Sequence, residues 1–311
     1  MAAAQGEGGP ALSPDTSLRA LVVGAGGQLG SDLLRELGAS ARGLTRADLD
    51  VTDGAAVRAA VGDWALAVRD LPGPLTVFNA AAWTDVDGAE ADEDAAFAAN
   101  AAAPAHLALA AEAAGARLVH VSTDYVFPGD AEEPYDVDDP TGPRSAYGRT
   151  KLAGERAVLA TSAGSYVVRT AWVYGAAGTN FVKTMARLER ERETVSVVDD
   201  QRGSPTWSRD LARGLVELAR RQPAPGVYHC TSRASATWYD LARAVFEELG
   251  ADPERVRPCT TADFPRPAPR PAYSVLSDRA WREAGLAPLP HWRDALRAAF
   301  AEVGEAFVPA S

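Results

Sequence analysis

A tyrosine and a lysine four residues apart, Tyr147 and Lys151, are the side chains of this chain best suited to chemistry. On a helix this spacing puts both side chains on one face. An ammonium beside a phenol favours the phenolate and lowers its pKa from about 10, so the phenol could donate or accept a proton near neutral pH. Arginine occupies nearly every basic position, and the only other lysine is Lys183. Because arginine cannot release a proton, a retained lysine suggests a task that arginine would do badly. A surface helix with a tyrosine on its edge is the alternative.

A glycine-rich turn near the N-terminus is the first element that could serve this pair. An apolar run at 18–23 leads into Gly24, Gly27 and Gly30, and a segment with helical spacing follows and stops at Gly38. This order is typical of the start of a dinucleotide-binding unit. There the first glycine permits the tight turn, the second lets the backbone approach a pyrophosphate, and the third lets the helix pack close to the strand. A plain glycine-rich turn between strand and helix is the alternative.

The residues about 20 positions beyond the glycines indicate which cofactor is bound. A dinucleotide site presents an acid there to the ribose 2′-hydroxyl, or a basic residue to a 2′-phosphate. This chain has Arg46 at that place, which favours NADPH, although a solvent-facing arginine would look the same. Asp50 could accept a hydrogen bond from an adenine amino group while Val51 covers the ring. Asp53 could instead cap the N-terminus of a helix.

The rest of the chain alternates strand and helix patterns. Further strands are expected at 41–45, 75–79, 118–122 and 166–170, and later helices at 180–192, 208–220, 237–249 and 291–303. This alternation predicts an α/β fold, a Rossmann-type doubly wound parallel sheet with a smaller C-terminal α/β substrate domain. The expected division is a disordered tail at 1–17, an NAD(P)-binding Rossmann domain at 18–175, and a mainly substrate-binding domain at 176–311. Part of this last segment, about 193–222, should return to the Rossmann sheet.

The composition excludes several classes of protein. A chain of 311 residues with 47% hydrophobic and 23% charged residues is ordinary for a soluble globular protein. Its net charge of −11 argues against nonspecific binding to nucleic acid or to anionic membranes. Without a membrane-length apolar run or a signal peptide, a cytoplasmic protein is expected. Cys230 and Cys259 should be buried thiols, and because no histidine or cysteine has metal-type spacing, no metal is assigned.

Several motifs occur in the order of an extended short-chain dehydrogenase/reductase. They are Gly24-x-x-Gly27-x-x-Gly30, Asn79-Ala-Ala-Ala, Ser122-Thr-Asp-Tyr-Val-Phe127, Tyr147-x-x-x-Lys151 and Arg169-Thr-Ala-Trp-Val-Tyr-Gly175. More specifically, the chain resembles the dTDP-4-dehydrorhamnose reductase family from about Leu18 to Phe300. The segments that carry this resemblance are NAAAWTDVDGAE, STDYVFPG, YGRTKLAGE, RTAWVYG, NFVKTM, DDQRGSPT and Arg270-Pro-x-x-Ser274-x-Leu276.

This resemblance implies the NAD(P)H-dependent reduction of the 4-keto group of dTDP-4-dehydro-L-rhamnose to dTDP-L-rhamnose. Tyr147 would donate the proton, and Thr123 would polarise the carbonyl with its hydroxyl. Lys151 would bind the nicotinamide ribose and hold the pKa of the tyrosine low. The cofactor would be NADPH, with NADH as the alternative. Thr123 could instead only cap the local backbone at the end of its strand.

The resemblance also implies roles for other residues. Gln28 and Leu29 would join Gly27 at the pyrophosphate, and Ala81, Ala82 and Trp83 would run beneath the cofactor. Residues expected to face the sugar are Asp124, Tyr125 and Trp172; those expected at the dTDP end are Asn180, Gln201 and Arg270. Trp172 could be plain core, Gln201 and Arg270 could be surface residues, and Asn100 could tether a proton-relay water or be bonded structurally. Trp83 and Asp85 depart from the usual family residues, which leaves the identity of the sugar in doubt.

Three other functions remain open on the sequence. The same chemistry on another dTDP-4-keto-6-deoxyhexose, as in antibiotic pathways, is the close alternative. An epimerase or dehydratase shares the fold, but a dehydratase would place a glutamate next to the acid after the active-site threonine, where this chain has Tyr125. A non-enzymatic regulatory subunit is disfavoured by the intact Thr123, Tyr147 and Lys151. The expected partner is a dTDP-sugar, the protein being a monomer or homodimer.

Overall fold

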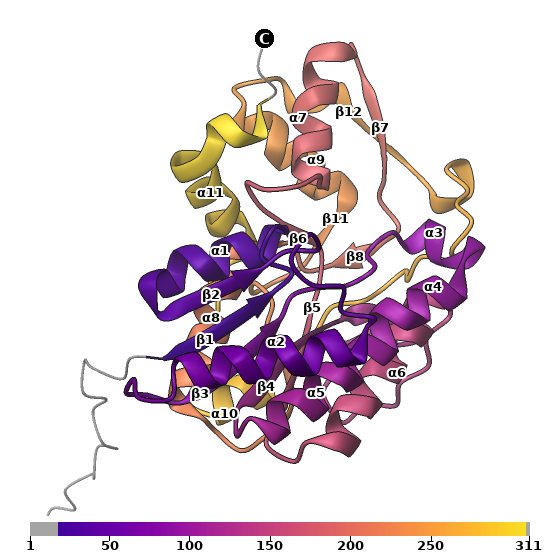
Figure 1. The fold of residues 1–311 in the computed structure, drawn as a ribbon. Coiled ribbons are helices and arrows are strands. Elements are labelled where there is room, and N and C mark those ends of the chain that lie inside the picture. The colour runs from indigo at the N-terminus through magenta and orange to yellow at the C-terminus, as the bar shows by residue number, and fades with distance from the viewer. Residues whose placement is uncertain (1–17, 309–311) are drawn as a thin grey trace, which may run out of the picture.

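Six parallel strands form the central sheet of the computed structural model, which describes residues 18–308 (Figure 1). The expected tail at 1–17 lies outside these residues. The strand order is β10-β5-β4-β3-β1-β2, and every neighbouring pair is parallel. The bounds are β1 (Arg19–Val23), β2 (Ala41–Leu44), β3 (Leu75–Asn79), β4 (Arg117–Thr123), β5 (Tyr166–Thr170) and β10 (Gly226–His229). Because the order reverses between β1 and β3, a ligand crevice is expected at their carboxyl ends.

Helices cover both faces of this sheet because its strands are apolar on both sides. Ala20 and Val22 of β1 pack in one layer with α1 (Gln28–Leu37) and α8 (Ser208–Arg221). Leu21 and Val23 pack in the other layer, against α2 (Gly54–Ala67), α5 (Ala103–Ala113) and α6 (Ala146–Thr161). The doubly wound Rossmann-type sheet predicted from the alternating pattern is therefore confirmed.

Several short helical elements join the strands and the longer helices. Between β3 and α5 lie α3 (Val86–Ala91), α4 (Glu93–Phe97) and a π-helical turn, η2 (Ala98–Ala102). A 3-10 turn, η3 (Asp124–Val126), follows β4 directly, and α10 (Arg279–Glu283) contacts β10. The other 3-10 turns are Gly38–Ser40, Pro253–Arg255 and Thr261–Asp263. The widened turn η2 lets Asn100, which is fully buried, reach across to the loop after β3.

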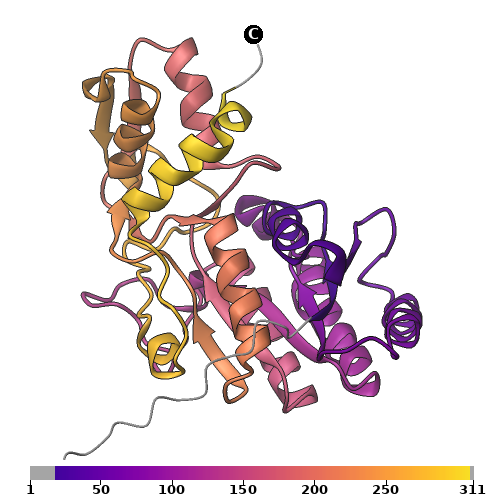
Figure 2. The ribbon, with the colours of Figure 1, turned by 90° about the vertical axis from the view of Figure 1, so that its left-hand side faces the viewer.

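A second group of elements stands above the carboxyl ends of the strands (Figures 1 and 2). Helices α7 (Phe181–Glu191), α9 (Trp238–Glu248) and α11 (Trp292–Phe307) share a core with the parallel pair β7 (Val195–Val198) and β12 (Val256–Cys259). Two short ribbons complete this group: β6 (Val173–Tyr174) with β9 (Thr206–Trp207), and β8 (Arg202–Gly203) with β11 (Ala236–Thr237). The four helices expected in the second half are found within a few residues of their predicted bounds, apart from the later end of α11.

The segment that returns to the sheet matches the expected 193–222 only in part. Its first part, β7, pairs with β12 in the second group instead. The return consists of α8, which packs on α1, and β10, which adds the sixth strand beside β5. The sequence of β10, Gly226-Val-Tyr-His229, is short and follows prolines, so its pattern alone does not indicate a strand.

Gly154 permits the close contact between α6 and η2, because a Cβ at this position would overlap the carbonyl oxygen of Asn100. We expect Gly154→Ala to lower the free energy of unfolding by about 1–3 kcal/mol through overpacking. Gly62→Ala is the matched control, since Gly62 lies on α2 with no atom near its Cβ position. That change should stabilise the protein by about 0.4–1 kcal/mol. Urea denaturation measures both values, and equal effects of the two changes would contradict this packing account.

Candidate active site

The first turn of α6 brings Tyr147 to the end of β4. Ser145 caps the helix by accepting a hydrogen bond from the N–H of Gly148 at 3.1 Å, and Glu90 accepts one from the N–H of Ala146 at 2.8 Å. Gly148 carries no Cβ that would overlap the carbonyl oxygen of Tyr125 in η3. The helix can therefore lie directly on the turn that follows Thr123.

The Tyr147 phenol does not have the lowered pKa expected from its sequence neighbour. Burial raises the pKa of Tyr147 to about 12, the nearby Thr123 hydroxyl opposes this in part, and the charge of Asp124 adds to the rise. The Tyr125 ring meets the Tyr147 ring edge-on, with centroids 5.5 Å apart. At neutral pH the phenol keeps its proton, which is the state that a proton donor requires.

Lys151 is directed toward the sheet. Its side chain is buried, and its ammonium donates a hydrogen bond to the carbonyl oxygen of Val121 on β4 at 2.7 Å. Burial lowers the pKa of Lys151 to about 8, partly offset by the negative charge of Glu155. The expectation that Lys151 depresses the pKa of Tyr147 is therefore wrong for this structure, because desolvation dominates both groups.

Thr123 and Asp124 form a buried polar pair at the strand end. The Thr123 hydroxyl donates to Asp124 Oδ1 at 2.9 Å and accepts from the N–H of Tyr125 at 3.2 Å. Burial raises the pKa of Asp124 to about 6, although hydrogen bonds oppose this. The nearby Ser274 hydroxyl also lowers the pKa of Asp124 in part, although the two side chains lack the geometry of a full hydrogen bond. The capping expected as an alternative for Thr123 is thus present beside its contact with Tyr147.

The glycine turn has the shape that a dinucleotide needs. Gly24 has a φ of 82°, and a Cβ there would lie 2.6 Å from the backbone nitrogen of Ala81. A Cβ on Gly30 would overlap the carbonyl oxygen of Gly24, so only glycine lets α1 approach β1. Gly27 is exposed, and no side chain caps α1. The N–H groups at the start of α1 are therefore available to an anion such as a pyrophosphate.

Gln28, expected at the pyrophosphate of the cofactor, and Asn180, expected at the dTDP end of the substrate, lie together. Asn180 Nδ2 donates to Gln28 Oε1 at 3.0 Å and to the carbonyl oxygen of Gly175 at 2.8 Å. Asn180 also caps α7, accepting a hydrogen bond from the N–H of Lys183. Asn180 therefore adjoins the cofactor turn, whereas the resemblance implied a place at the dTDP end.

The loop after β2 carries the residues expected near the adenosine. Arg46 is exposed at its start, and Val51 packs against the core of that face. Asp50 Oδ1 accepts hydrogen bonds from the N–H and the hydroxyl of Thr52. Asp53 caps α2 through the N–H groups of Ala55 and Ala56, as the alternative for this residue predicted.

The loop after β3 holds Trp83 beside Tyr147. Ala81 donates its N–H to Asn79 Oδ1 at 3.1 Å, and Ala82 follows in the same exposed loop. Asn100 fixes Trp83 by accepting from its N–H at 2.9 Å and donating to its carbonyl oxygen at 3.1 Å. Both Trp83 and Tyr147 pack on the same small alanine cluster. The structural role considered for Asn100 is present here, with Thr150 as a further partner.

Arg270 forms a contact that its sequence position did not indicate. Its Nη2 lies 2.9 Å from Asp87 Oδ2, and Arg266 Nη1 lies 3.8 Å from the same oxygen. The N–H of Ala268 donates to Asp87 Oδ1 at 3.1 Å. Asp87 thus ties α3 to a loop about 180 residues away. In the sequence, only the concentration of arginines near Arg270 indicates an acidic partner. It does not identify Asp87 as that partner.

The remaining predicted substrate residues hold the second group together. Trp172 has a φ of 49° and stacks on Trp238, with ring centroids 3.5 Å apart. Gly203 lies so close to the Trp172 ring that a Cβ would be 2.5 Å from it. Gln201 donates to the hydroxyl of Thr261 at 2.9 Å. Trp172 is partly buried and therefore combines a packed ring with an edge that remains accessible.

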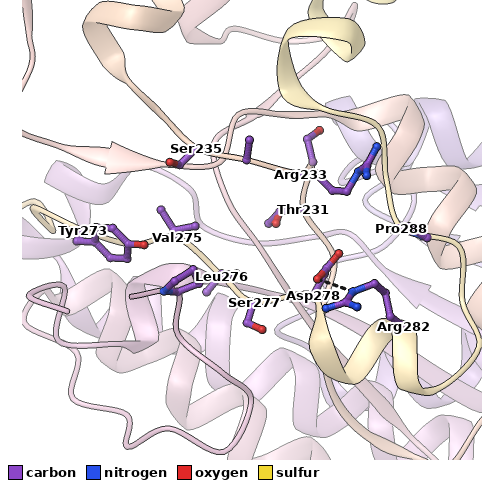
Figure 3. Close-up of a pocket in the computed structure, with 13 residues that line it drawn as sticks. Thr231, Arg233, Ser235, Tyr273, Val275, Leu276, Ser277, Asp278, Arg282 and Pro288 are labelled. Atoms are coloured by element: carbon purple, nitrogen blue, oxygen red, sulfur yellow. Dashed lines mark hydrogen bonds and ion pairs between the residues drawn. The ribbon is translucent and has the colours of Figure 1, made fainter. Parts of the chain in front are cut away.

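A cavity of about 530 Å³ lies apart from these groups (Figure 3). The loop after β10 and the segment Tyr273–Asp278 line it, with Thr231, Ser235 and Ser277 as hydroxyl groups. The Arg282–Asp278 ion pair, with an N–O distance of 2.9 Å, borders it on one side. None of the predicted site residues lines this cavity, so it adds nothing to the Tyr147 site.

Two kinds of site are absent from the part of the chain that the structure describes. In residues 18–308, no three or more His, Cys, Asp or Glu side chains are grouped so that they could hold a metal ion. Within the same range, no helix has both the length and the apolar character that crossing a membrane requires.

The sheet order, the glycine turn at its switch point and the Tyr-x-x-x-Lys helix together define the architecture of an extended short-chain dehydrogenase/reductase. Comparison with known proteins narrows this class. The family described as "RmlD substrate binding domain" matches residues 18–305. The chain therefore belongs to this family, the dTDP-4-dehydrorhamnose reductase family that its motifs indicate.

Individual relatives agree over nearly the whole chain. A dTDP-4-dehydrorhamnose reductase of Streptomyces griseus is 51% identical over 298 residues, covering 93% of this chain and 95% of that protein. A probable dTDP-4,6-dihydroxy-2-methyloxan-3-one 4-ketoreductase of Streptomyces antibioticus is 51% identical over 295 residues, covering 92% and 96%. The crystal structure of dTDP-4-dehydrorhamnose reductase from Bacillus anthracis in complex with NADP is 36% identical, with a TM-score of 0.86, covering 91% and 99%.

The buried Asp124 predicts a specific pH dependence of stability. Its pKa in the folded protein, about 6, lies above the ordinary 3.8, so the folded state binds more protons between these values. Its contribution to stability is therefore present at low pH and is lost as the pH rises through about 6. We expect Asp124→Asn to reduce the fall in unfolding free energy between pH 4 and pH 7 by on the order of 2 kcal/mol.

Urea denaturation at several pH values measures this slope. Asp70→Asn is the control, because the side chain of Asp70 is 89% exposed. Identical slopes for Asp124→Asn and the unchanged protein would show that Asp124 does not bind the extra proton.

Proposed function

We propose that this protein reduces the 4-keto group of dTDP-4-dehydro-L-rhamnose to give dTDP-L-rhamnose, with NADPH as the reductant. The observation that carries this proposal is the contact of Tyr147 with Thr123 at the carboxyl end of β4, on the edge of the sheet that also bears the glycine turn. Membership of the family and relatives named as 4-keto-sugar reductases support it.

Tyr147 and Thr123 would act on the keto oxygen. The chemistry that NADPH would supply here is a hydride for the sugar C4, which would leave negative charge on that oxygen. The Thr123 hydroxyl would exchange its hydrogen bond to Asp124 for one to this oxygen, and Tyr147 would give the oxygen the proton that completes the alcohol. A phenol with a pKa of about 12 can still protonate an alkoxide, which is a much stronger base. Asp124 and Tyr125 would contact the sugar.

The cofactor would lie along the glycine turn. Gly27, Gln28 and Leu29 would meet the pyrophosphate with the N–H groups of α1, while Gly24 and Gly30 shape the turn. Asp50 and Val51 would flank the adenine, and Ala81, Ala82 and Trp83 would lie beneath the cofactor. Lys151 would bind the nicotinamide ribose after exchanging its hydrogen bond with Val121. An NADP complex of a relative 36% identical supports this placement.

The nucleotide end of the substrate would lie toward the second group of elements. Arg270 is the proposed contact for the diphosphate, because its planar fork can bind two oxygens. Trp172 and Gln201 would border the same region. The Asp87 carboxylate lies 2.9 Å from Arg270 Nη2, so a bound diphosphate would exchange with this carboxylate.

Purified protein given dTDP-4-dehydro-L-rhamnose and NADPH should consume the reduced cofactor and form dTDP-L-rhamnose. The relative from Streptomyces antibioticus bears the name of another 4-keto sugar, so a second dTDP-4-keto-6-deoxyhexose belongs in the assay. Turnover of only this second sugar would move the proposal to that substrate, and no turnover of either sugar would refute it. We expect Tyr147→Phe to lower kcat by roughly 100-fold or more.

The matched control for this change is Tyr228→Phe. The Tyr228 hydroxyl donates to the carbonyl oxygen of Ala224, and none of the proposed site residues contacts it. Its loss should leave kcat within about twofold of the unchanged protein, since no role in proton transfer is involved. Activity of Tyr147→Phe within the same range would exclude the phenol as the proton donor.

Arg46 should determine the preference for NADPH. We expect Arg46→Ala to raise KM for NADPH about tenfold by removing a charge-assisted contact to the 2′-phosphate, with KM for NADH unchanged. Arg42→Ala is the control, because Arg42 is also exposed and lies on β2 just before the loop. Equal rises in KM for the two cofactors would place Arg46 away from the 2′-phosphate.

A further inference from the structure

A buried ion pair lies one turn beyond Lys151 on helix α6. Arg169 on β5 binds the Glu155 carboxylate with two nitrogens, Nε at 3.0 Å from Oε1 and Nη2 at 2.8 Å from Oε2. The two side chains are only 5% and 2% exposed. Separating the two groups would leave an uncompensated charge in the protein interior, which is strongly unfavourable. The ion pair therefore fixes the position of the Glu155 carboxylate.

Two further side chains, Phe127 and His229, contact Arg169. Its guanidinium lies over the Phe127 ring, 4.9 Å from the centroid, and its Nη1 lies 3.4 Å from His229 Nε2. Burial, followed by the charge of Arg169, lowers the pKa of His229 to about 3, so this histidine is neutral. Its Nε2 can therefore accept from Arg169 while Nδ1–H donates to the carbonyl oxygen of Ser277 at 3.2 Å.

Glu155 and Lys151 share one face of α6, since they are four residues apart. The only hydrogen bond of the Lys151 ammonium in the described chain goes to the carbonyl oxygen of Val121. An uncharged acceptor compensates little for the loss of water around a buried cation. The carboxylate of Glu155 is therefore the group that can keep this buried ammonium protonated.

Other charged or titratable groups face α6 without taking this role. They belong to the elements packed on the helix and are Glu90, Glu93, Glu112, His120, the Asp124–Tyr125 pair and Arg169. Glu93 is paired with Arg149, Glu90 accepts from the N–H of Ala146, and Glu112 accepts from Ser162. Burial lowers the pKa of His120 well below its ordinary value, so it is neutral. Of all these groups and Glu155, only the charge of Glu155 raises the pKa of Lys151.

We propose that Glu155 is a positioning residue of the reductase: held by Arg169, it fixes the rotation of α6 beneath the cofactor site and keeps Lys151 cationic. This role rests on the proposed function, in which a cationic Lys151 binds the nicotinamide ribose. In this way the Arg169–Glu155 ion pair, anchored on β5, determines the charge of Lys151, the residue proposed to contact the cofactor.

The lysine composition of the chain permits a direct test that needs no turnover. With lysine labelled at Cε by carbon-13, Lys151 and Lys183 give the only two lysine signals, and Lys183→Arg assigns them. In Glu155→Gln we expect the pKa of Lys151 to fall by about one unit, because a nearby negative charge is removed. Glu93→Gln is the matched control, since Glu93 on α4 pairs with Arg149, another residue of α6. This variant should leave the titration of Lys151 unchanged.

Glu155→Gln also leaves Arg169 buried without a counter-charge, which could prevent folding. The double variant Glu155→Gln with Arg169→Met removes both charges and decides the question in that case. We expect the double variant to fold. It should show the same further fall in the pKa of Lys151 as Glu155→Gln, because it also lacks the carboxylate. A Lys151 titration in either folded variant that matches the unchanged protein would overturn the proposal.

The enzymatic readout is the basic limb of kcat/KM for NADPH, which reports ionisations of the free enzyme. This limb should move toward lower pH by about one unit in Glu155→Gln, while KM for the sugar changes by less than about twofold. Lower activity with an unmoved limb would show a purely structural effect and would overturn the proposal. If the protein reduces neither sugar, the proposed function is refuted. The effect of Glu155 on the charge of Lys151 is still tested, because the lysine titration needs no turnover.

Discussion

Helix α6 can lie where it does because two of its residues have no side chain. Gly148 faces the carbonyl oxygen of Tyr125, and Gly154 faces that of Asn100, at distances that leave no room for a Cβ. These two contacts press the helix onto the turn after β4 and onto the π-helical turn. Tyr147 then reaches Thr123, and Asn100 can hold the backbone of Trp83. The geometry of the proposed active site thus depends on backbone packing more than on side-chain hydrogen bonds.

Close packing of this kind also determines the electrostatics of the site. Tyr147, Lys151, Asp124 and His120 all have pKa values shifted by burial, each toward its uncharged form. Beneath the site, the Glu155 carboxylate contacts the guanidinium of Arg169 directly. The site therefore combines the neutral phenol of Tyr147 with the buried ammonium of Lys151, whereas their proximity in the sequence alone would have suggested a phenolate.

The sequence predicted the elements that depend on local patterns. Apolar runs and helical spacing placed β1, β3 and β5 and the starts of α7, α8 and α9 within about a residue, and the glycines marked the turn between β1 and α1. It could not reveal β10, whose four residues follow prolines, or the direction of the Lys151 side chain. The partners of Asn180 and Arg270 lie 152 and about 180 residues away in the chain, so only the folded topology brings them together.

The Asp87–Arg270 pair has a consequence for how ionic strength should affect this protein. A chain with a net charge of −11 repels an anionic nucleotide at long range. If a diphosphate replaces Asp87 at Arg270, one anion is exchanged for another on the same guanidinium. The affinity then depends on added salt less than a free arginine would suggest, because the cation is shielded before the ligand arrives. The same exchange leaves Asp87 without its partner, so the loop that carries Arg270 has a reason to move when the substrate binds.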